Sequence, residues 1–257
     1  MYTDLTGKVV LVSGSSSGIG RATALAYATE GARVGITYHR DRDGAEQTAE
    51  AVRAAGGEGL VCRYDLRDER TAQDTVEQVA ERWGGLDVLV ANAISWGDAI
   101  PRPGAPRPAF EDVPAKQWQD VLQTTVAGPY HLVQAALPAM RGRPWGRIVF
   151  LGAGLADTGL PGAGSYGAGK SALYGLARSL AWELGERDIL VNTVVPGQTL
   201  TANVLAHMPA PAREAKAATL PTGRMSTPED VATAVVFLGS AANGNITGET
   251  LRVTGGS

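Results

Sequence analysis

The chain has 257 residues, a formal net charge of −3 and a single cysteine, Cys62. This length suits one α/β domain with a full core, and we expect a single domain over residues 1–257. The charge provides no basic stripe for nucleic acid, while one cysteine excludes an internal disulfide and fits a reducing, cytoplasmic compartment. The sequence shows no signal-peptide pattern and no uninterrupted apolar run that could span a membrane. We therefore expect neither nucleic acid nor a membrane as a partner.

Strand-like and helix-like runs alternate along the chain. Apolar, β-branched runs predict strands at residues 8–13, 33–38, 60–64, 86–91, 147–152, 188–194 and 249–253. Helices are predicted at residues 18–30, 43–55, 68–83, 113–140, 165–186 and 228–240. This alternation is typical of right-handed βαβ units. We therefore expect a Rossmann-type, doubly wound, seven-stranded parallel sheet with helices on both faces, in which Cys62 fills the core.

The turn after the first predicted strand is rich in small residues. Residues 13–20 read Ser-Gly-Ser-Ser-Ser-Gly-Ile-Gly, between an apolar strand and a helix. Small residues let the backbone approach a pyrophosphate, and a helix N-terminus offers free N–H groups and the positive end of its dipole. The pattern predicts a dinucleotide-binding site that uses Gly14, Ser16, Ser17, Gly18, Ile19 and Gly20.

The end of the second predicted strand indicates which dinucleotide binds. An acidic residue there would hold the ribose hydroxyls and repel a 2′-phosphate, but none occurs before Asp41. His39 and Arg40 instead offer hydrogen-bond donors and positive charge, and the hydroxyls of residues 15–17 can add to them. We expect NADP(H) as the cofactor and no metal site.

Two long segments interrupt the alternation. Residues 95–109 contain four prolines, and residues 197–227 contain three. Loops of this length in a compact domain are usually functional. Both segments follow strand ends, so both can border one cleft, and we expect 197–227 to be a substrate loop.

Tyr166 and Lys170 lie one helical turn apart at the start of an apolar, helix-like run. An ammonium near a phenol favours the phenolate, so Lys170 is expected to lower the pKa of Tyr166. A phenol tuned in this way can exchange a proton with a carbonyl or an alcohol. The pair predicts an acid–base site.

In combination, these features resemble the short-chain dehydrogenase/reductase family, closely so its single-domain, ketoreductase-like members, from Gly7 to Gly256. The resemblance implies that Tyr166 is the proton donor and that Lys170 assists it. It also implies a small-molecule substrate and a homo-oligomer, a dimer or homotetramer, paired through the helices at 113–140 and 165–186. Further cofactor contacts are implied for Asp65 and Leu66 at the adenine, Asn92 and Ala93 beside the ribose, and Pro196, Gly197 and Thr201 at the nicotinamide half and pyrophosphate.

The chain departs from the family pattern at four positions. Ala153 stands where a carbonyl-binding serine is usual, and Thr125 replaces an asparagine that helps to hold a water chain from the lysine. Ile94 replaces a glycine, and Ser17 stands where NADP-using relatives often carry a basic residue. Loss of one carbonyl donor commonly lowers the rate by about 100- to 1000-fold.

Three hypotheses accommodate these departures. The first is a ketone reductase whose substrate supplies its own polarisation, or in which Ser95, Thr158 or Ser165 replaces the missing hydroxyl. The second is a reductase of a C=C or C=N bond, which needs no such clamp. The third is a non-redox protein, either a nucleotide-binding regulator or a cyclase-like relative.

Apolar residues after the strand ends indicate a bulky substrate. A cleft lined in this way suits a flat or polycyclic ligand. We expect an aromatic, polyketide-like ketone of secondary metabolism. The expected pocket residues are Ile94, Ser95, Trp96, Ile100, Ala153, Leu155, Leu160, Val204, Leu205 and Met208.

Overall fold

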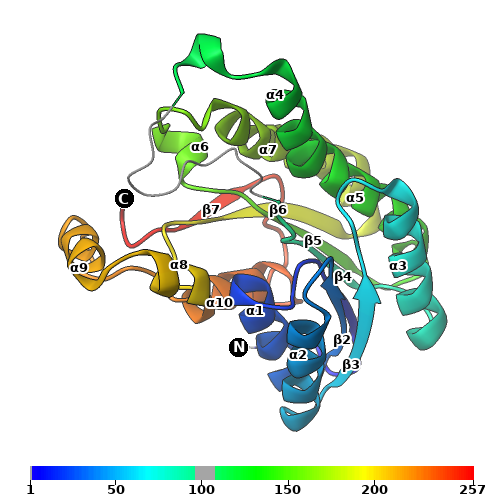
Figure 1. Cartoon of the computed structure of the whole chain (residues 1–257). Coiled ribbons are helices and arrows are strands. Elements are labelled where there is room, and N and C mark those ends of the chain that lie inside the picture. Colours follow the sequence, from blue (N-terminus) through cyan, green and yellow to red (C-terminus); the bar gives the residue numbers. More distant parts are fainter. Residues whose placement is uncertain (1, 96–107) are drawn as a thin grey trace.

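The computed structural model describes residues 2–95 and 108–257 of the chain. In this part, seven strands form one parallel sheet at the centre of the molecule (Figure 1). They are β1 (Val9–Val12), β2 (Arg33–Tyr38), β3 (Glu58–Arg63), β4 (Val88–Ala91), β5 (Gly146–Leu151), β6 (Ile189–Pro196) and β7 (Thr250–Val253). Their spatial order is β3-β2-β1-β4-β5-β6-β7. The predicted architecture is confirmed, and the strand order reverses between β1 and β4, where such folds bind ligands.

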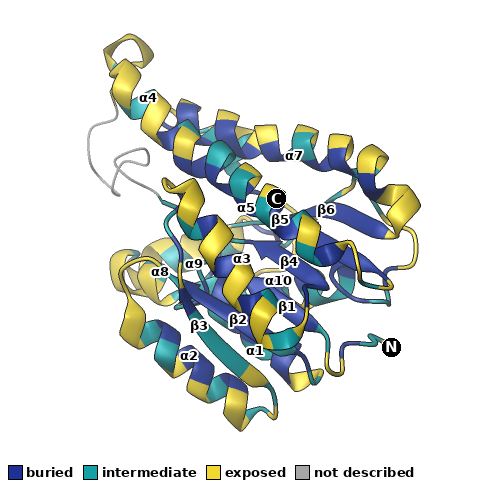
Figure 2. Ribbon diagram, turned by 90° about the vertical axis from the view of Figure 1, so that its right-hand side faces the viewer, coloured by how far each residue is buried: buried dark blue, intermediate teal, exposed yellow. Residues whose placement is uncertain are grey.

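Helices cover both faces of the sheet (Figures 1 and 2). One face carries α1 (Gly18–Thr29), α2 (Arg42–Ala54) and α10 (Pro228–Leu238). The other face carries α3 (Glu69–Trp83), α5 (Gly128–Met140) and α7 (Gly164–Leu184). Among the described residues, no helix combines the length and apolarity needed to cross a membrane.

Two buried cores lie on opposite sides of the sheet because successive side chains of a strand point to opposite faces. In β1, Leu11 packs with the α3, α5 and α7 side, while Val12 packs with the α1, α2 and α10 side. Strands buried on both faces read as continuous apolar runs, which explains why sequence patterning located them well. Cys62 is buried in one core, and burial raises the pKa of its thiol to about 11, as expected for a core residue.

The helix predicted over residues 113–140 is divided in the structure. It consists of α4 (Ala115–Leu122), a π-helical segment (Gln123–Ala127) and α5, and a short 3₁₀ turn (Phe110–Asp112) precedes it. Pro129 lies in the first turn of α5 and has no N–H to donate to the carbonyl four residues earlier. This missing bond accounts for a local change of helix type at that place.

The segment 197–227 contains two helices that the sequence reading does not predict, α8 (Ala202–His207) and α9 (Ala210–Ala218). Prolines indicate a loop there, but Pro209 is the N-cap of α9 and Pro211 lies in its first turn, where proline is favoured. A further short helix, α6 (Leu155–Thr158), follows β5, and a 3₁₀ turn (Gly185–Arg187) follows α7. Trp96 and Ile100 lie outside the described residues.

Candidate active site

The glycine turn between β1 and α1 packs closely against the end of β4. A Cβ atom on Gly14 would lie 2.8 Å from the Cα of Ala93, and one on Gly20 would lie 2.3 Å from the carbonyl oxygen of Gly14. Gly14 and Gly18 also have φ values of +65° and +55°, which favour glycine. The spacing of these glycines is therefore required by the local geometry.

The N-terminus of α1 is available to an anion. Ser17 is its N-cap in an extended conformation, its side chain makes no capping hydrogen bond, and the first turn has no acidic residue. The N–H groups and the positive dipole end thus remain for a phosphate. Thr201, the N-cap of α8, closes the opposite side, because its Cγ2 lies 3.3 Å from where a Gly18 Cβ would be. This cradle fits the pyrophosphate of a dinucleotide.

Serine and asparagine side chains brace the cradle. Asn92 donates its amide to the carbonyl oxygens of Ser13 (2.8 Å) and Gly14 (3.1 Å), and Ser13 Oγ accepts from the backbone N–H groups of Asn92 and Ala93. Ser15 is fully buried, donates to the Val12 carbonyl and accepts from the Thr37 N–H. The expectation that the Ser15 hydroxyl can reach a 2′-phosphate is therefore wrong, because it holds β1 to β2 instead.

The groups expected at the adenosine end come from neighbouring strands. His39 Nε2 lies 3.2 Å from Asp65 Oδ2, and Asp65 Oδ1 accepts from the Arg67 N–H. Leu66 is buried beside Gly128. Arg40 is exposed and makes no ion pair with a described residue. Of the two groups expected at a 2′-phosphate, Arg40 is thus the one without an ion-pair partner among the described residues.

Tyr166 and Lys170 come together on α7 as the sequence predicts. Both side chains are buried and face the end of β5. Lys170 Nζ donates to the carbonyl oxygen of Leu151 at 2.6 Å and lies 6.0 Å from the centre of the Tyr166 ring.

Burial decides the proton affinities of this pair. Desolvation, with a smaller effect from Tyr174, raises the pKa of the Tyr166 phenol, whereas desolvation lowers the pKa of Lys170 to about 8. The expected lowering of the Tyr166 pKa by Lys170 is therefore not found in the polypeptide itself. The reason is that both groups are withdrawn from water and the ammonium points at the Leu151 carbonyl.

The sequence is similar to those of known reductases. A family model described as enoyl-(acyl carrier protein) reductase matches residues 14–257. The chain is 36% identical over 257 residues to the 3-oxoacyl-[acyl-carrier-protein] reductase FabG of Haemophilus influenzae, covering 98% of each chain. It is 35% identical over 252 residues to FabG of Pseudomonas aeruginosa, again covering 98% of each.

Solved structures of dehydrogenases and reductases have the same fold. A dehydrogenase/reductase from Sinorhizobium meliloti 1021 superposes with a TM-score of 0.87 at 32% identity, covering 98% of this chain and 95% of that one. Acetoin dehydrogenase YohF from Salmonella typhimurium gives 0.84 at 34% identity, covering 97% and 96%. The chain belongs to the short-chain dehydrogenase/reductase family. It is an enzyme, a ketoreductase-like oxidoreductase, so the non-redox alternative is set aside.

In this family member, the phenol lies in an apolar cluster. Tyr166, Val121 and Ala153 are buried against one another, and Ile94 and Leu155 pack on them. The methyl group of Ala153 therefore stands beside the phenol where the family pattern has a hydroxyl. Val121 was not identified from sequence, since nothing within an amphipathic helix distinguishes it.

The proposed substitutes for the missing hydroxyl differ in their contacts. The Thr158 hydroxyl is committed to the carbonyl oxygen of Gly154 at 3.2 Å. Ser165 is buried beside Tyr166 in α7. Ser95 lines a pocket of about 400 Å³ together with Val121 of the phenol cluster. Ser95 is thus the one with space around it.

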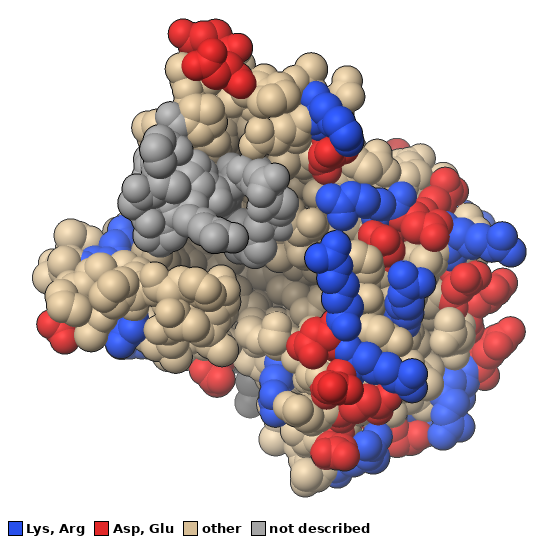
Figure 3. Space-filling model, in the orientation of Figure 1, with Lys and Arg blue, Asp and Glu red and all other residues tan. Residues whose placement is uncertain are grey.

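The remaining predicted pocket residues lie farther out. Val204, Leu205 and Met208 come from α8 and its C-cap, and Leu160 from the segment after α6; none belongs to the buried cluster around Tyr166. Leu205 is 51% exposed, so it does not line a closed cavity. Figure 3 shows this face of the molecule hollowed beside α8, with a largely uncharged surface there.

Thr125, in the π-helical segment, faces the helix that carries Lys170. A Cβ atom on Gly169 would lie 2.9 Å from the Cβ of Thr125. The Thr125 hydroxyl is buried without a hydrogen-bond partner among the described residues. Thr125 therefore places a buried hydroxyl where the family pattern has the amide of an asparagine.

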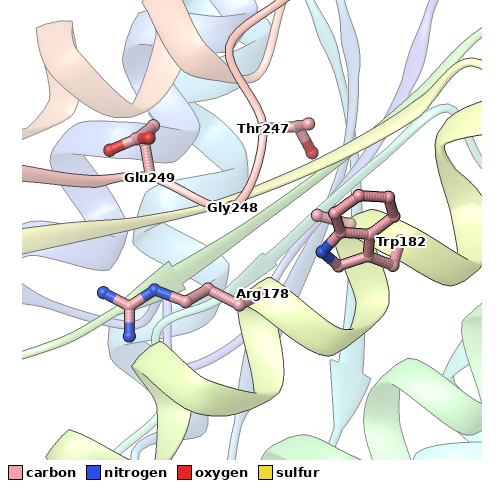
Figure 4. A pocket seen from close by; sticks show the side chains of 6 residues that line it. Arg178, Trp182, Thr247, Gly248 and Glu249 are labelled. Carbon is pink, nitrogen blue, oxygen red and sulfur yellow. The ribbon is translucent and has the colours of Figure 1, made fainter.

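A second hollow lies apart from the phenol cluster. It measures about 470 Å³ between α7 and the connection into β7, and Figure 4 shows Arg178 and Trp182 on its helical side. It is lined by Arg178, Ala181, Trp182, Thr247, Gly248 and Glu249. None of the predicted site residues lines it.

Proposed function

We propose that the enzyme reduces a carbonyl group of a bulky, apolar, polyketide-like substrate with NADPH, and that Tyr166 donates the proton. The observation that carries this proposal is the buried cluster of Tyr166, Val121 and Ala153, one helical turn from Lys170. An apolar wall of this kind favours an uncharged, hydrophobic substrate.

Several residues would hold the cofactor. The N–H groups at the start of α1 would bind the pyrophosphate, and Thr201 would cover it. Arg40 would pair with the 2′-phosphate, because its guanidinium has no ion pair with a described residue. When bound, NADPH supplies a hydride.

The proton affinity of Tyr166 supports the direction of reaction. Burial raises the pKa of its phenol, so the oxygen keeps its proton at neutral pH and can give it to a developing alkoxide. Lys170, with a pKa lowered to about 8 by burial, stays largely protonated at neutral pH. Its ammonium donates to the Leu151 carbonyl, so it must turn from that carbonyl to stabilise the phenolate that remains after transfer.

The alanine at position 153 defines what the substrate must provide. The Ala153 side chain offers no donor to a carbonyl oxygen, and loss of such a donor costs about 100- to 1000-fold in rate. A vinylogous, quinone-like or internally hydrogen-bonded ketone is already polarised and needs less help. An activated aromatic ketone is therefore a better substrate than a simple one.

The names of the relatives support carbonyl chemistry, since the 3-oxo group that the FabG proteins reduce is a ketone. A second candidate is reduction of a C=C bond. It is favoured by the description of the matching family model as an enoyl reductase and by the lack of a hydroxyl at Ala153.

Product analysis separates these candidates. The purified enzyme is incubated with NADPH and matched pairs of polycyclic ketones and enones, and the products are identified by NMR. We expect a secondary alcohol from the ketone and an intact C=C bond in the enone. A saturated ketone as the sole product would reject the carbonyl reductase in favour of the second candidate.

We also propose a homo-oligomer, a dimer or tetramer, assembled through α4, α5 and α7. Trp182 on α7 is 90% exposed and Tyr130 on α5 is 46% exposed, which supports contact with a second copy. Light scattering should give a mass that is a multiple of the monomer, and Trp182→Glu should lower it. A monomer at micromolar concentration would contradict this assembly. The cytoplasmic location stays a prediction.

A further inference from the structure

We propose that Tyr174 is a positioning residue for this active site: it fixes the turn that carries Ala153 and so sets the wall beside the catalytic phenol. This inference rests on the proposed function for the identity of the reaction. It adds a residue that neither the sequence pattern nor the comparisons single out.

Three side chains on successive turns of α7 face the chain after β5. Tyr166 packs on the side chain of Ala153, and Lys170 donates to the Leu151 carbonyl at 2.6 Å. Tyr174 donates its hydroxyl to the Ala153 carbonyl at 3.2 Å. Lys170 and Tyr174 thus donate to the carbonyls of Leu151 and Ala153, so α7 is hydrogen-bonded to this turn at two points.

The ring of Tyr174 also packs on the turn itself. A Cβ atom on Gly152 would lie 2.8 Å from Cε1 of Tyr174 and 2.8 Å from Cγ2 of Val195, so the ring and this valine share the space that the glycine leaves. The Ala153 carbonyl additionally accepts from the Ala156 N–H at 2.9 Å, which starts α6. Tyr174 therefore restrains both the turn and the short helix that presents Leu155.

An external restraint matters here because Ala153 lies between two glycines. Gly152 and Gly154 can adopt many backbone conformations, so the sequence of the turn does not fix its own shape. The Ala153 carbonyl and side chain share one Cα atom, so a displacement of this backbone segment moves the methyl group relative to Tyr166. Misplacement by about 1 Å near the reacting atoms can cost about 100-fold in rate.

The ion pair of Asp157 and Arg252 lies near the Tyr174 hydroxyl and acts on its pKa. Burial, followed by the nearby Asp157 carboxylate, raises the pKa of Tyr174, so its hydroxyl keeps the proton that it donates. Asp157 in turn pairs with Arg252 of β7, with Nε and Oδ2 3.0 Å apart. The turn is thereby connected through α6 to the last strand of the sheet.

The test removes only the hydroxyl. In Tyr174→Phe we expect kcat for the ketone to fall about tenfold, a fraction of the loss for a full 1 Å displacement. The KM for NADPH should change less than about twofold, because the nucleotide cradle is elsewhere. Backbone amides of residues 152–158 should exchange hydrogen faster. Tyr2→Phe is the matched control, since the Tyr2 side chain is 78% exposed and its hydroxyl donates to Asp4, away from the active site.

A double-mutant cycle distinguishes positioning from general stability. If Ala153→Ser raises activity on a simple ketone, adding Tyr174→Phe should cancel most of that gain, because the new hydroxyl is no longer held in place. An undiminished gain in the double variant would overturn the positioning role. If Tyr174→Phe does not fold, Gly152→Ala, whose Cβ would meet both the Tyr174 ring and Val195, should lower kcat and speed hydrogen exchange over residues 152–158, and unchanged values of both would equally overturn it.

Hydrogen exchange keeps this inference separable from the proposed function. It requires no turnover, so a wild-type enzyme inactive on every ketone would reject the function and still permit the comparison. Wild-type exchange over residues 152–158 in a folded Tyr174→Phe variant would reject the inference alone.

Discussion

Substituting serine for Ala153 tests whether a polarised substrate compensates for the absence of a hydrogen-bond donor to the carbonyl at this position. The side chain is 8% exposed, is flanked by Gly152 and Gly154, and packs against Tyr166 and Val121. One added oxygen is a small change of volume, and the partly buried Ile94 and Leu155 can shift to admit it. We therefore expect Ala153→Ser to fold normally.

The magnitude follows from one recovered hydrogen bond. A donor that acts on the developing alkoxide would return roughly 1–3 kcal/mol of transition-state stabilisation, which is about 5- to 150-fold in rate. An unactivated cyclic ketone should gain by that factor. An activated polycyclic ketone should gain little, because its carbonyl is already polarised.

The assay compares kcat/KM for Ala153→Ser and for wild type on both ketones, from the decrease of NADPH absorbance. The predicted result is a variant-to-wild-type ratio that is at least about fivefold larger for the simple ketone. Equal ratios for the two ketones would refute the idea that substrate activation compensates for Ala153. A folded variant that is inactive on both would indicate a different substrate orientation.

Three further predictions concern the pair on α7 and the cofactor site. Tyr166→Phe should lower kcat at least about 100-fold while NADPH affinity, measured by fluorescence, stays within about twofold; near-normal turnover would reject Tyr166 as the donor. Arg40→Ala should raise the apparent Kd for NADPH by about tenfold and barely change that for NADH, and a wild-type preference for NADH would show the charge argument to be wrong. Burial lowers the pKa of Lys170 from its ordinary 10.5 to about 8, so the unfolded state binds more protons between these values. Its contribution to stability therefore rises with pH over that window and is lost as pH falls through about 8. Urea unfolding from pH 8 to 10 should show a smaller rise for Lys170→Met than for wild type.

The parts of the fold that depend on local patterns could be predicted from the sequence. The strands were located because buried parallel strands are continuous apolar runs, and the glycine turn because its conformation permits almost no other residue. Tyr166 and Lys170 were paired because helical spacing places them on one face. The α8 and α9 helices were missed because proline at a helix start reads like proline in a loop.

The remaining features depend on tertiary contacts. The pairing of His39 with Asp65 requires β2 and β3 to lie side by side, and the contact of Val121 with Tyr166 requires α4 to pack against α7. The direction of the Tyr166 pKa was predicted wrongly from an adjacent charge because desolvation, which is larger, depends on burial. The role of Tyr174 follows from its contact with a backbone carbonyl, for which the sequence has no signal.

The destination of a deuteride shows directly which bond the enzyme reduces. An activated polycyclic ketone is incubated with the enzyme and NADPH that carries deuterium at the transferable position, and the product is examined by NMR and mass spectrometry. One deuterium is expected on the new carbinol carbon, and formation of this product should be abolished in Tyr166→Phe. Deuterium on a former alkene carbon next to an intact ketone, or an unlabelled ketone recovered with all of the NADPH, would contradict this expectation.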